Sequence, residues 1–319
     1  MDETARATAG PQRRAGGPLK HLLTLAGLGR VELTALLDAA ATMRAAPAEP
    51  LRQRLPGRTI AMLFFEASTR TRTSFEIAAL RLGADVVRLD DGHSSTTKGE
   101  TLEDTVATLE AMGCDAFVIR HRENGLPGRL ATHSRRAAII NAGDGTGAHP
   151  TQGLIDLLTI RDHRGAVDGA GVVICGDVRH SRVARSAVDG LQALGAGSIR
   201  LCGPERLLPA AGEFPGCEIT ADFDAALAGA DVVMMLRLQK ERMDAAMIGD
   251  ANEYFRRYGL DAARLRRARP DAIVMHPGPM NRGIEIAADV ADGPQSVVLE
   301  QVHNGVPVRM AVLDRLLDA

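Results

Sequence analysis

Five consecutive side chains with hydroxyl or guanidinium groups, Ser68-Thr69-Arg70-Thr71-Arg72, follow an apolar, strand-like segment at residues 59–65. Directly after them, apolar residues recur at helical spacing from Phe75 to Leu82, and Gly83 is placed to end the helix. The polar run therefore stands at the junction between a predicted strand and the start of a predicted helix, where side chains and backbone N–H groups converge.

The chemistry of this junction favours an anion with several oxygens. Ser68 or Thr69 can cap the helix, which leaves backbone N–H groups at its positive end, and Arg70 adds a charged donor. The alternative is an ordinary capped helix with a charged first turn. Two arginines in that turn oppose the helix dipole unless an anion is present, so the pattern indicates a phosphate site.

Polar clusters follow other predicted strands in the same way. They are Arg120 after residues 116–119, His149–Gln152 after 137–141, Arg237–Gln239 after 231–236, and His276–Pro279 after 272–275. Ligands in open α/β sheets bind at the carboxyl ends of the strands. If the carboxyl ends of two such sheets face each other, these clusters form one active site in the cleft between two domains.

The alternation of strands and helices predicts an α/β fold with two doubly wound parallel-sheet domains. We expect a disordered N-terminal arm at residues 1–18, a first domain from residues 19–149 together with 304–319, and a second domain from residues 150–303. Thr101 and Asp104 resemble a capping box that opens a further helix, and apolar residues from Val308 to Leu316 form the closing helix.

The composition of the 319 residues excludes several functional classes. No apolar run reaches the ~18 residues of a membrane span, no secretory signal opens the chain, and a net charge of −2 provides no broad basic field for nucleic acid. Four separated cysteines are expected as free thiols, which favours the cytoplasm. No residues stand at metal-ligand spacing, and Gly176-Asp177 lacks the glycine spacing of a dinucleotide site, so we expect neither a metal nor a nucleotide cofactor.

Individual side chains in the first domain and at the start of the second suit distinct tasks. His149 and Gln152 leave the same helix start and suit polarising a carbonyl oxygen, although His149 can also be a structural helix-start residue. Arg120 suits an anion, with a surface ion pair as the alternative. Lys98 is one of only three lysines among 38 basic residues, which favours a role for a compact point charge.

The second domain offers two carboxylate sites. Arg182 stands near the start of a helix, and Arg237 and Gln239 share one face of an extended segment. An exposed surface charge is the alternative for each arginine. No Ser-His-Asp or Cys-His arrangement provides a covalent nucleophile. One phosphate site, two carboxylate sites and a carbonyl-polarising pair together indicate transfer of an acyl-like group between bound small molecules.

From about Leu19 onward, the chain resembles the aspartate carbamoyltransferase family. Five stretches stand in the family's order: Ser68-Thr69-Arg70-Thr71-Arg72, Ser94…Lys98-Gly99-Glu100-Thr101, His149-Pro150-Thr151-Gln152, Arg237-Leu238-Gln239-Lys240-Glu241-Arg242 and His276-Pro277-Gly278-Pro279. Ornithine-specific members look different at the last stretch, with a cysteine where Pro277 stands here. Ala67 and Gly278 depart from the pattern of many relatives, without removing a ligand.

The resemblance implies a role for each stretch. The phosphate of carbamoyl phosphate is held by Ser68, Thr69, Arg70, Thr71 and Arg120. Its carbonyl oxygen is surrounded by Thr71, Arg120 and His149. Its amino group is received by Gln152 and the Gly278–Pro279 region. Arg182 binds the α-carboxylate of aspartate, and Arg237 and Gln239 bind the side-chain carboxylate. Ser94 and Lys98 reach in from a neighbouring subunit, so the active unit is a homotrimer, and Arg72 is left with a structural role. The implied catalytic set is Arg70, Thr71, Lys98, Arg120 and His149.

The implied reaction gives N-carbamoyl-L-aspartate and phosphate, a step of de novo pyrimidine biosynthesis. The neutral amine of aspartate attacks the carbamoyl carbon. The enzyme accelerates this step by orienting the substrates and by electrostatic stabilisation, without a metal or organic cofactor. The alternatives are a carbamoyltransferase for another amino acceptor and a catalytically silent scaffold subunit. A larger assembly with a regulatory chain or a dihydroorotase-like partner also fits, with the N-terminal arm as either a docking segment or a disordered tail.

Overall fold

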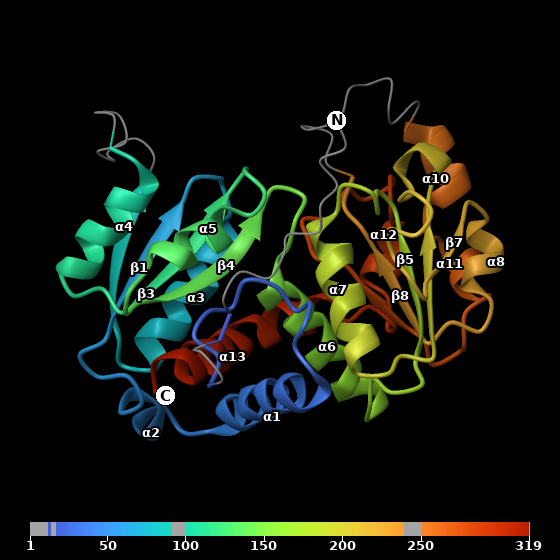
Figure 1. Cartoon of the computed structure of the whole chain (residues 1–319). Helices are drawn as coiled ribbons and strands as arrows, with labels where there is room; N and C mark the ends of the chain where they lie inside the picture. Colours follow the sequence, from blue (N-terminus) through green and yellow to red (C-terminus); the bar gives the residue numbers. More distant parts are fainter. Residues whose placement is uncertain (1–11, 14–16, 91–99, 239–250, 319) are drawn as a thin grey trace. The chain divides into compact units, whose positions relative to one another are not determined.

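The computed structural model describes residues 12–13, 17–90, 100–238 and 251–318, which fold into two compact units. The first unit comprises Met1–Ile155 and His303–Ala319, and the second comprises Asp156–Val302. Two helices, α6 (Pro150–Arg164) and α13 (Val298–Leu317), carry the chain from one unit to the other (Figure 1). None of the helices in the described part of the chain is long and apolar enough to cross a membrane.

The first unit is built on four parallel strands in the order β2-β1-β3-β4, of which Figure 1 labels β1, β3 and β4. The strands are β1 (Thr59–Phe64), β2 (Asp85–Asp90), β3 (Ala116–His121) and β4 (Ala138–Asp144). The helices are α1 (Arg30–Ala45), α2 (Ala48–Arg52), α3 (Thr69–Arg81), α4 (Leu102–Ala111) and α5 (Leu126–His133). Residues 60–64 of β1 are all buried, as expected for a parallel strand that is covered on both faces.

The second unit is built on five parallel strands in the order β7-β6-β5-β8-β9. The strands are β5 (Gly171–Cys175), β6 (Ser198–Cys202), β7 (Glu218–Thr220), β8 (Val232–Met235) and β9 (Ile273–Met275). The helices are α7 (Arg182–Ala193), the 3-10 turn η3 (Glu205–Leu207), α8 (Phe223–Leu227), α10 (Ala251–Tyr258), α11 (Ala262–Leu265) and α12 (Ala288–Ala291). Side chains of β5, β8 and β9 pack with Phe223, Tyr254 and Leu260 in one core.

The predicted class, two parallel-sheet α/β domains, is confirmed, and several element boundaries agree with the sequence. α3 begins at Thr69, and the Thr101 hydroxyl caps α4 by accepting a hydrogen bond from the Asp104 backbone N–H at 3.1 Å. α13 begins at Val298, ten residues before the predicted Val308. The prediction started the helix too late because proline normally ends a helical pattern, and Pro307 lies inside this helix. The three-residue strand β7 was not predicted, since it carries little apolar signal.

Two residues of the arm predicted over residues 1–18 belong to the folded unit. Gln12 is buried, and its side-chain oxygen accepts hydrogen bonds from the backbone N–H groups of Leu23 at 2.8 Å and Thr24 at 3.2 Å. Arg13 forms an ion pair with Glu32 at 3.3 Å. Residues 1–11 and 14–16 of the arm lie outside the described residues.

His21 lies against the edge strand β4 and must stay neutral there. Its Nδ1 accepts a hydrogen bond from the Ile139 backbone N–H at 2.9 Å, and the residue is almost fully buried. Burial, and secondly the charge of Lys20, lower the His21 pKa to about 4 from the 6.5 of a free histidine. Between these two pH values the unfolded chain binds more protons than the folded protein, so stability falls as the pH falls through the window.

We expect His21→Asn to remove this part of the acid sensitivity, since the asparagine oxygen can accept the same hydrogen bond without titrating. Protonation of His21 accounts for up to about 3 kcal/mol of unfolding free energy lost between pH 6.5 and pH 4. Urea unfolding of both proteins at pH 7 and pH 4.5 measures the difference. Parallel losses in the variant and in the wild type would show that His21 does not cause the sensitivity.

Candidate active site

The strand order of the first unit brings two of the predicted phosphate ligand groups together. The chain leaving β1 passes through α3 to β2 on one side, and the chain leaving β3 passes through α5 to β4 on the other. Ligands bind at such a switch point, outside the carboxyl ends of the strands. Residues 68–71 follow β1 and Arg120 lies at the end of β3, where it is the register partner of Phe64. The Phe65 N–H also donates to the Arg120 carbonyl at 2.9 Å.

The start of α3 has the character of an anion site. Ser68 occupies the N-cap position, but its hydroxyl makes no capping hydrogen bond, so the predicted side-chain cap is wrong while its position is right. The first turn contains no acidic residue that would neutralise the positive end of the helix dipole. Thr71 is buried, whereas Thr69 and Arg70 are exposed. The first backbone N–H groups of a helix have no acceptor within the helix, so this positive end favours an anionic ligand.

Arg72 is engaged by its own helix. Its Nε lies 3.2 Å from Oε1 of Glu76 one turn later, and Glu76 also accepts two hydrogen bonds from Arg88 of β2 at 2.7 and 3.0 Å. The hydrogen bond from Arg88 is the largest influence lowering the pKa of Glu76. This ion-pair network ties α3 to β2 and supports the structural role expected for Arg72.

Arg120 is held between two neighbouring elements. Its Nη1 donates to the Ala142 carbonyl of β4 at 3.3 Å, and its Nε lies 3.6 Å from Oε2 of Glu66 in the loop after β1. The arginine side chain is only 13% exposed, so the ion pair given as the alternative does form, but it is largely buried and not at the surface. Glu66, which the sequence did not single out, orients this guanidinium. Only the strand pairing identifies it, because 54 residues separate it from Arg120 along the chain.

The turn before His149 is fixed by a buried carboxylate, that of Asp144. It accepts hydrogen bonds from the backbone N–H groups of Gly125 and Ala148, both at 2.7 Å, and from the side chain of Asn141 at 2.9 Å. His149 itself is buried at the start of α6, and Gln152 follows in the first turn, half-buried. Sequence reasoning missed Asp144, although its place in a glycine-rich turn at a strand end was a signal.

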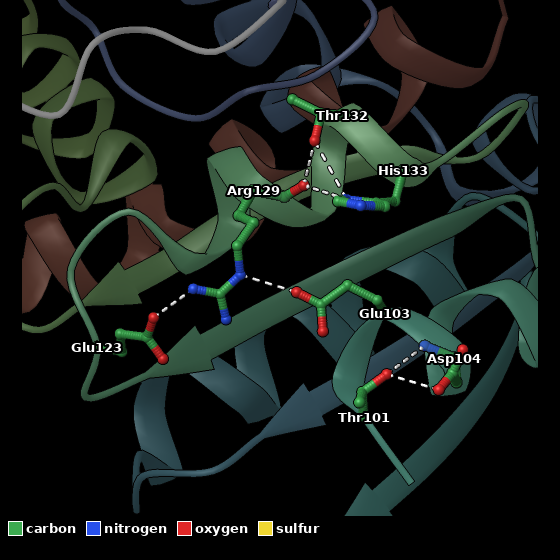
Figure 2. Close-up of polar contacts among 7 residues, drawn as sticks. All are labelled: Thr101, Glu103, Asp104, Glu123, Arg129, Thr132 and His133. Atoms are coloured by element: carbon green, nitrogen blue, oxygen red, sulfur yellow. Dashed lines mark hydrogen bonds and ion pairs between the residues drawn. The ribbon is translucent and has the colours of Figure 1, made fainter.

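α4, which follows residues 91–99, is anchored to α5 through Arg129 (Figure 2). Its Nε donates to Glu103 of α4 at 2.8 Å, and its Nη1 donates to Glu123. The Arg129 hydrogen bond lowers the pKa of Glu103. The segment that carries the predicted ligands Ser94 and Lys98 lies outside the described residues, but the helix that follows it is thus held in place.

The second sheet has its own switch point between β5 and β8, and the predicted carboxylate ligands flank it. Arg182 is the first residue of α7, behind a cap in which the Ser181 hydroxyl accepts from the Ala184 N–H at 3.1 Å. Arg182 is buried, and Arg237 is half-buried two residues beyond β8. The Leu236 N–H donates to the Cys175 carbonyl at 2.7 Å, which joins the ends of the two strands. Gln239, the third predicted ligand, lies outside the described residues.

The loop after β9 completes this group of strand ends. Gly278 has a φ of +64°, a backbone conformation that favours glycine, and the Gly278–Pro279 peptide bond is cis. The Gly278 N–H donates to Nδ1 of the buried His276 at 2.8 Å. The departure noted at Gly278 in the sequence thus coincides with a backbone conformation that suits glycine.

His180 adds a titratable group beside Arg182 that the sequence did not assign. Its Nδ1 lies 2.9 Å from Oδ1 of Asp177, and this hydrogen bond is the largest influence raising the His180 pKa.

No group of three or more His, Cys, Asp and Glu side chains is arranged to hold a metal ion within residues 12–13, 17–90, 100–238 and 251–318. The predicted ligands among the described residues carry guanidinium, hydroxyl, imidazole and amide groups, which suit anionic substrates.

These observations define a two-domain α/β protein in which each unit carries polar and cationic groups at a strand-order switch point. Comparison with models of known protein families identifies the family to which such a protein belongs. Residues 20–162 match the family described as aspartate/ornithine carbamoyltransferase, carbamoyl-P binding domain, and residues 168–316 match the aspartate/ornithine carbamoyltransferase, Asp/Orn binding domain. The chain belongs to the aspartate/ornithine carbamoyltransferase family.

Individual relatives are similar over nearly the whole chain. The aspartate carbamoyltransferase catalytic subunit of Xanthomonas euvesicatoria pv. vesicatoria is 54% identical and covers 96% of this chain and 98% of its own. The corresponding subunit of Gluconobacter oxydans is 56% identical, over 93% of this chain and 95% of its own.

Solved structures from both branches of the family have the same fold. Aspartate transcarbamoylase from Trypanosoma cruzi, in complex with carbamoyl aspartate and phosphate, superposes with a TM-score of 0.83 at 31% identity, over 96% of this chain and 98% of that one. Ornithine carbamoyltransferase from Pyrococcus furiosus superposes with a TM-score of 0.84 at 29% identity, over 98% and 99%. The fold alone therefore does not separate the two amino acceptors.

Proposed function

We propose that this chain is the catalytic subunit of an aspartate carbamoyltransferase, which transfers the carbamoyl group of carbamoyl phosphate to L-aspartate. The observation that carries the proposal is identity above 50%, over nearly the whole chain, to subunits named for this activity. Pro277, in the place of the ornithine-type cysteine, supports the aspartate branch. The presence of Arg70, Lys98, Arg120 and His149 argues against a silent scaffold.

The start of α3 and the end of β3 would hold carbamoyl phosphate. Ser68, Thr69, Arg70 and Thr71 bind the phosphate with helix N–H groups, Arg120 bridges the phosphate and the carbonyl oxygen, and Thr71 and His149 complete the surroundings of that oxygen. Gln152 and the Gly278–Pro279 backbone receive the amino group. The buried position of His149 and the bonds that fix its turn support this role, because a carbonyl-polarising donor must be preorganised.

The second unit would hold aspartate. Arg182 binds the α-carboxylate, and Arg237 with Gln239 binds the side-chain carboxylate. Burial of Arg182 at the start of α7 supports this assignment, because a desolvated guanidinium binds a carboxylate more strongly than an exposed one.

The chemistry follows from these positions. The neutral amine of aspartate attacks the carbamoyl carbon and forms the new C–N bond. The tetrahedral intermediate collapses as the C–O bond to phosphate breaks, and the phosphate, stabilised by Arg70, Arg120 and Lys98, accepts the proton of the amine. Positioning and electrostatic stabilisation supply the rate enhancement, with no protein nucleophile. We expect carbamoyl phosphate to bind first and aspartate second.

We also propose that three copies assemble and that Ser94 and Lys98 serve the site of a neighbouring copy. Apolar side chains on α3 and the edge strand β2 support a contact with a second copy: Leu80 is 56% exposed and Val87 is 38% exposed. Native mass measurement of the purified chain should give a trimer. A monomer that retains full activity would contradict the shared site. We propose that this trimer acts in the cytoplasm, in de novo pyrimidine biosynthesis. If it belongs to a larger assembly, a regulatory chain or a dihydroorotase-like partner would bind it.

The activity is tested by incubating the purified chain with carbamoyl phosphate and either L-aspartate or L-ornithine. We expect N-carbamoyl-aspartate and phosphate in equal amounts with aspartate, and no citrulline with ornithine. Turnover of ornithine would move the chain to the other branch. The absence of any product with either acceptor would favour the silent scaffold.

A further inference from the structure

A histidine and a glutamate that the proposed mechanism does not use are buried together beneath the loop after β9. The side chains of His276 and Glu285 are both 0% exposed, and Nε2 of His276 lies 3.2 Å from Oε1 of Glu285. The surrounding core is apolar, with Tyr254 and Ile286 among its members. Burying two ionisable groups in such a place is costly unless each makes specific hydrogen bonds.

The hydrogen bonds of the pair determine which nitrogen of His276 carries the imidazole proton. The Gly278 N–H donates to Nδ1 of His276 at 2.8 Å, so Nδ1 carries no proton. Nε2 therefore carries the imidazole proton and donates it to Oε1 of Glu285. The same carboxylate oxygen accepts a second hydrogen bond from the Asn281 backbone N–H. One histidine tautomer and one carboxylate oxygen thus hold the loop at two points on either side of Pro279.

The pair is also connected to the segment after β8. The side-chain amide of Asn281 donates to the Leu238 carbonyl at 3.2 Å, and Leu238 directly follows Arg237. On the side of His276, the pair is anchored by the His276 backbone N–H, which donates to the side-chain oxygen of Gln301 at 2.9 Å. Gln301 in turn donates to Asp156 of α6 at 2.9 Å. A continuous set of hydrogen bonds within the second unit therefore supports both loops.

The second oxygen of Glu285 shows that this arrangement is not optimised for stability alone. Oε2 is buried and has no hydrogen-bond partner among the described residues. An unsatisfied buried oxygen destabilises the fold, and apolar residues of similar volume would avoid that cost. What an apolar pair lacks is the acceptor at Oε1, which receives both His276 and the loop N–H.

We propose that His276 and Glu285 are positioning residues that hold the Gly278–Pro279 backbone and, through Asn281, the Arg237 segment in their substrate-binding geometry. The inference rests on the proposed function and deepens it, since these loops are the ones assigned to the carbamoyl amino group and the aspartate side chain. It predicts that the pair controls the use of aspartate without affecting phosphate binding, which belongs to the first unit.

Two matched variants separate hydrogen bonding from packing. Glu285→Gln keeps an oxygen acceptor, and its second group occupies the position of the unpartnered Oε2. Glu285→Leu has a similar volume without an acceptor. We expect Glu285→Leu to raise KM for aspartate and lower kcat, each by about 10-fold, which corresponds to the loss of one or two hydrogen bonds. Glu285→Gln should stay within about 3-fold of the wild type, and the affinity for inorganic phosphate should be unchanged in both.

Three outcomes would overturn the inference: unchanged aspartate kinetics in Glu285→Leu, equal damage in both variants, or a parallel loss of phosphate affinity. If Glu285→Leu does not fold, the His276→Asn variant tests the inference instead. The asparagine side-chain oxygen can accept the hydrogen bond from the Gly278 N–H, but the hydrogen bond donated to Glu285 is lost. It should show the same separation, with impaired use of aspartate and normal phosphate binding. A wild-type chain that does not carbamoylate aspartate would refute the proposed function instead, so the two failures are distinguishable.

Discussion

Replacing Arg70 with alanine should lower kcat by about 10³-fold, because it removes a charged donor that stabilises the leaving phosphate as the C–O bond breaks. Arg70 lies in the first turn of α3, where no acidic residue offsets the positive end of the helix. Its side chain is exposed, so its removal creates no cavity and the fold should remain intact. Steady-state formation of N-carbamoyl-aspartate, with thermal unfolding measured alongside, checks both parts of the prediction.

Arg72→Ala is the matched control on the same helix. This arginine is paired with Glu76 at 3.2 Å, so its loss should cost less than about 1 kcal/mol of stability and leave kcat within a few-fold of the wild type. An Arg70→Ala variant with most of its activity, or an Arg72→Ala variant as inactive as Arg70→Ala, would show that the phosphate ligands are assigned incorrectly.

Arg182→Met should lower kcat/KM for aspartate by about 10²–10³-fold, the usual cost of removing one partner of a desolvated charge pair. Methionine keeps much of the side-chain volume at this buried helix start, so the loss should reflect the missing guanidinium. Since Arg182 belongs to the second unit, the affinity for phosphate alone should not change. Kinetics at varied aspartate and calorimetric titration with phosphate measure the two quantities.

The control for this prediction is Arg179→Ala, in the turn three residues before Arg182. Arg179 is exposed, and its replacement should leave aspartate kinetics near those of the wild type. A similar loss in both variants would indicate a general effect of positive charge on this surface. Normal aspartate kinetics in Arg182→Met would remove Arg182 from the site.

Local sequence signals were sufficient for the elements that carry the predicted ligands. The boundary between apolar β1 and the polar run at residues 68–72 marked the start of α3 correctly, because strand burial and helix periodicity are both local properties. The predicted ligand groups in the described residues lie at strand ends or at the helix starts that follow them, since a parallel sheet collects its connections there. The switch points themselves depend on strand order, which the spacing of apolar residues does not encode.

The residues that orient those ligands could not be found in this way. Glu66 meets Arg120 only because β1 and β3 are neighbours, and Glu285 meets His276 only because the chain folds back after β9. Their carboxylates resemble surface charges in the sequence, and burial alone distinguishes them. The start of α13 was missed for a different reason, since the rest of the helix compensates for the hydrogen bond that Pro307 cannot donate.

The central claim is that both units act on one pair of substrates. N-(phosphonacetyl)-L-aspartate, which the Trypanosoma cruzi enzyme binds, carries a phosphonate and two carboxylates in a single molecule. In calorimetric titration we expect one molecule to bind per chain, with affinity at least about 100-fold weaker in both Arg70→Ala and Arg182→Met and unchanged in Arg72→Ala and Arg179→Ala. Full affinity in either Arg70→Ala or Arg182→Met would contradict the account, because it would show that one unit alone holds the ligand.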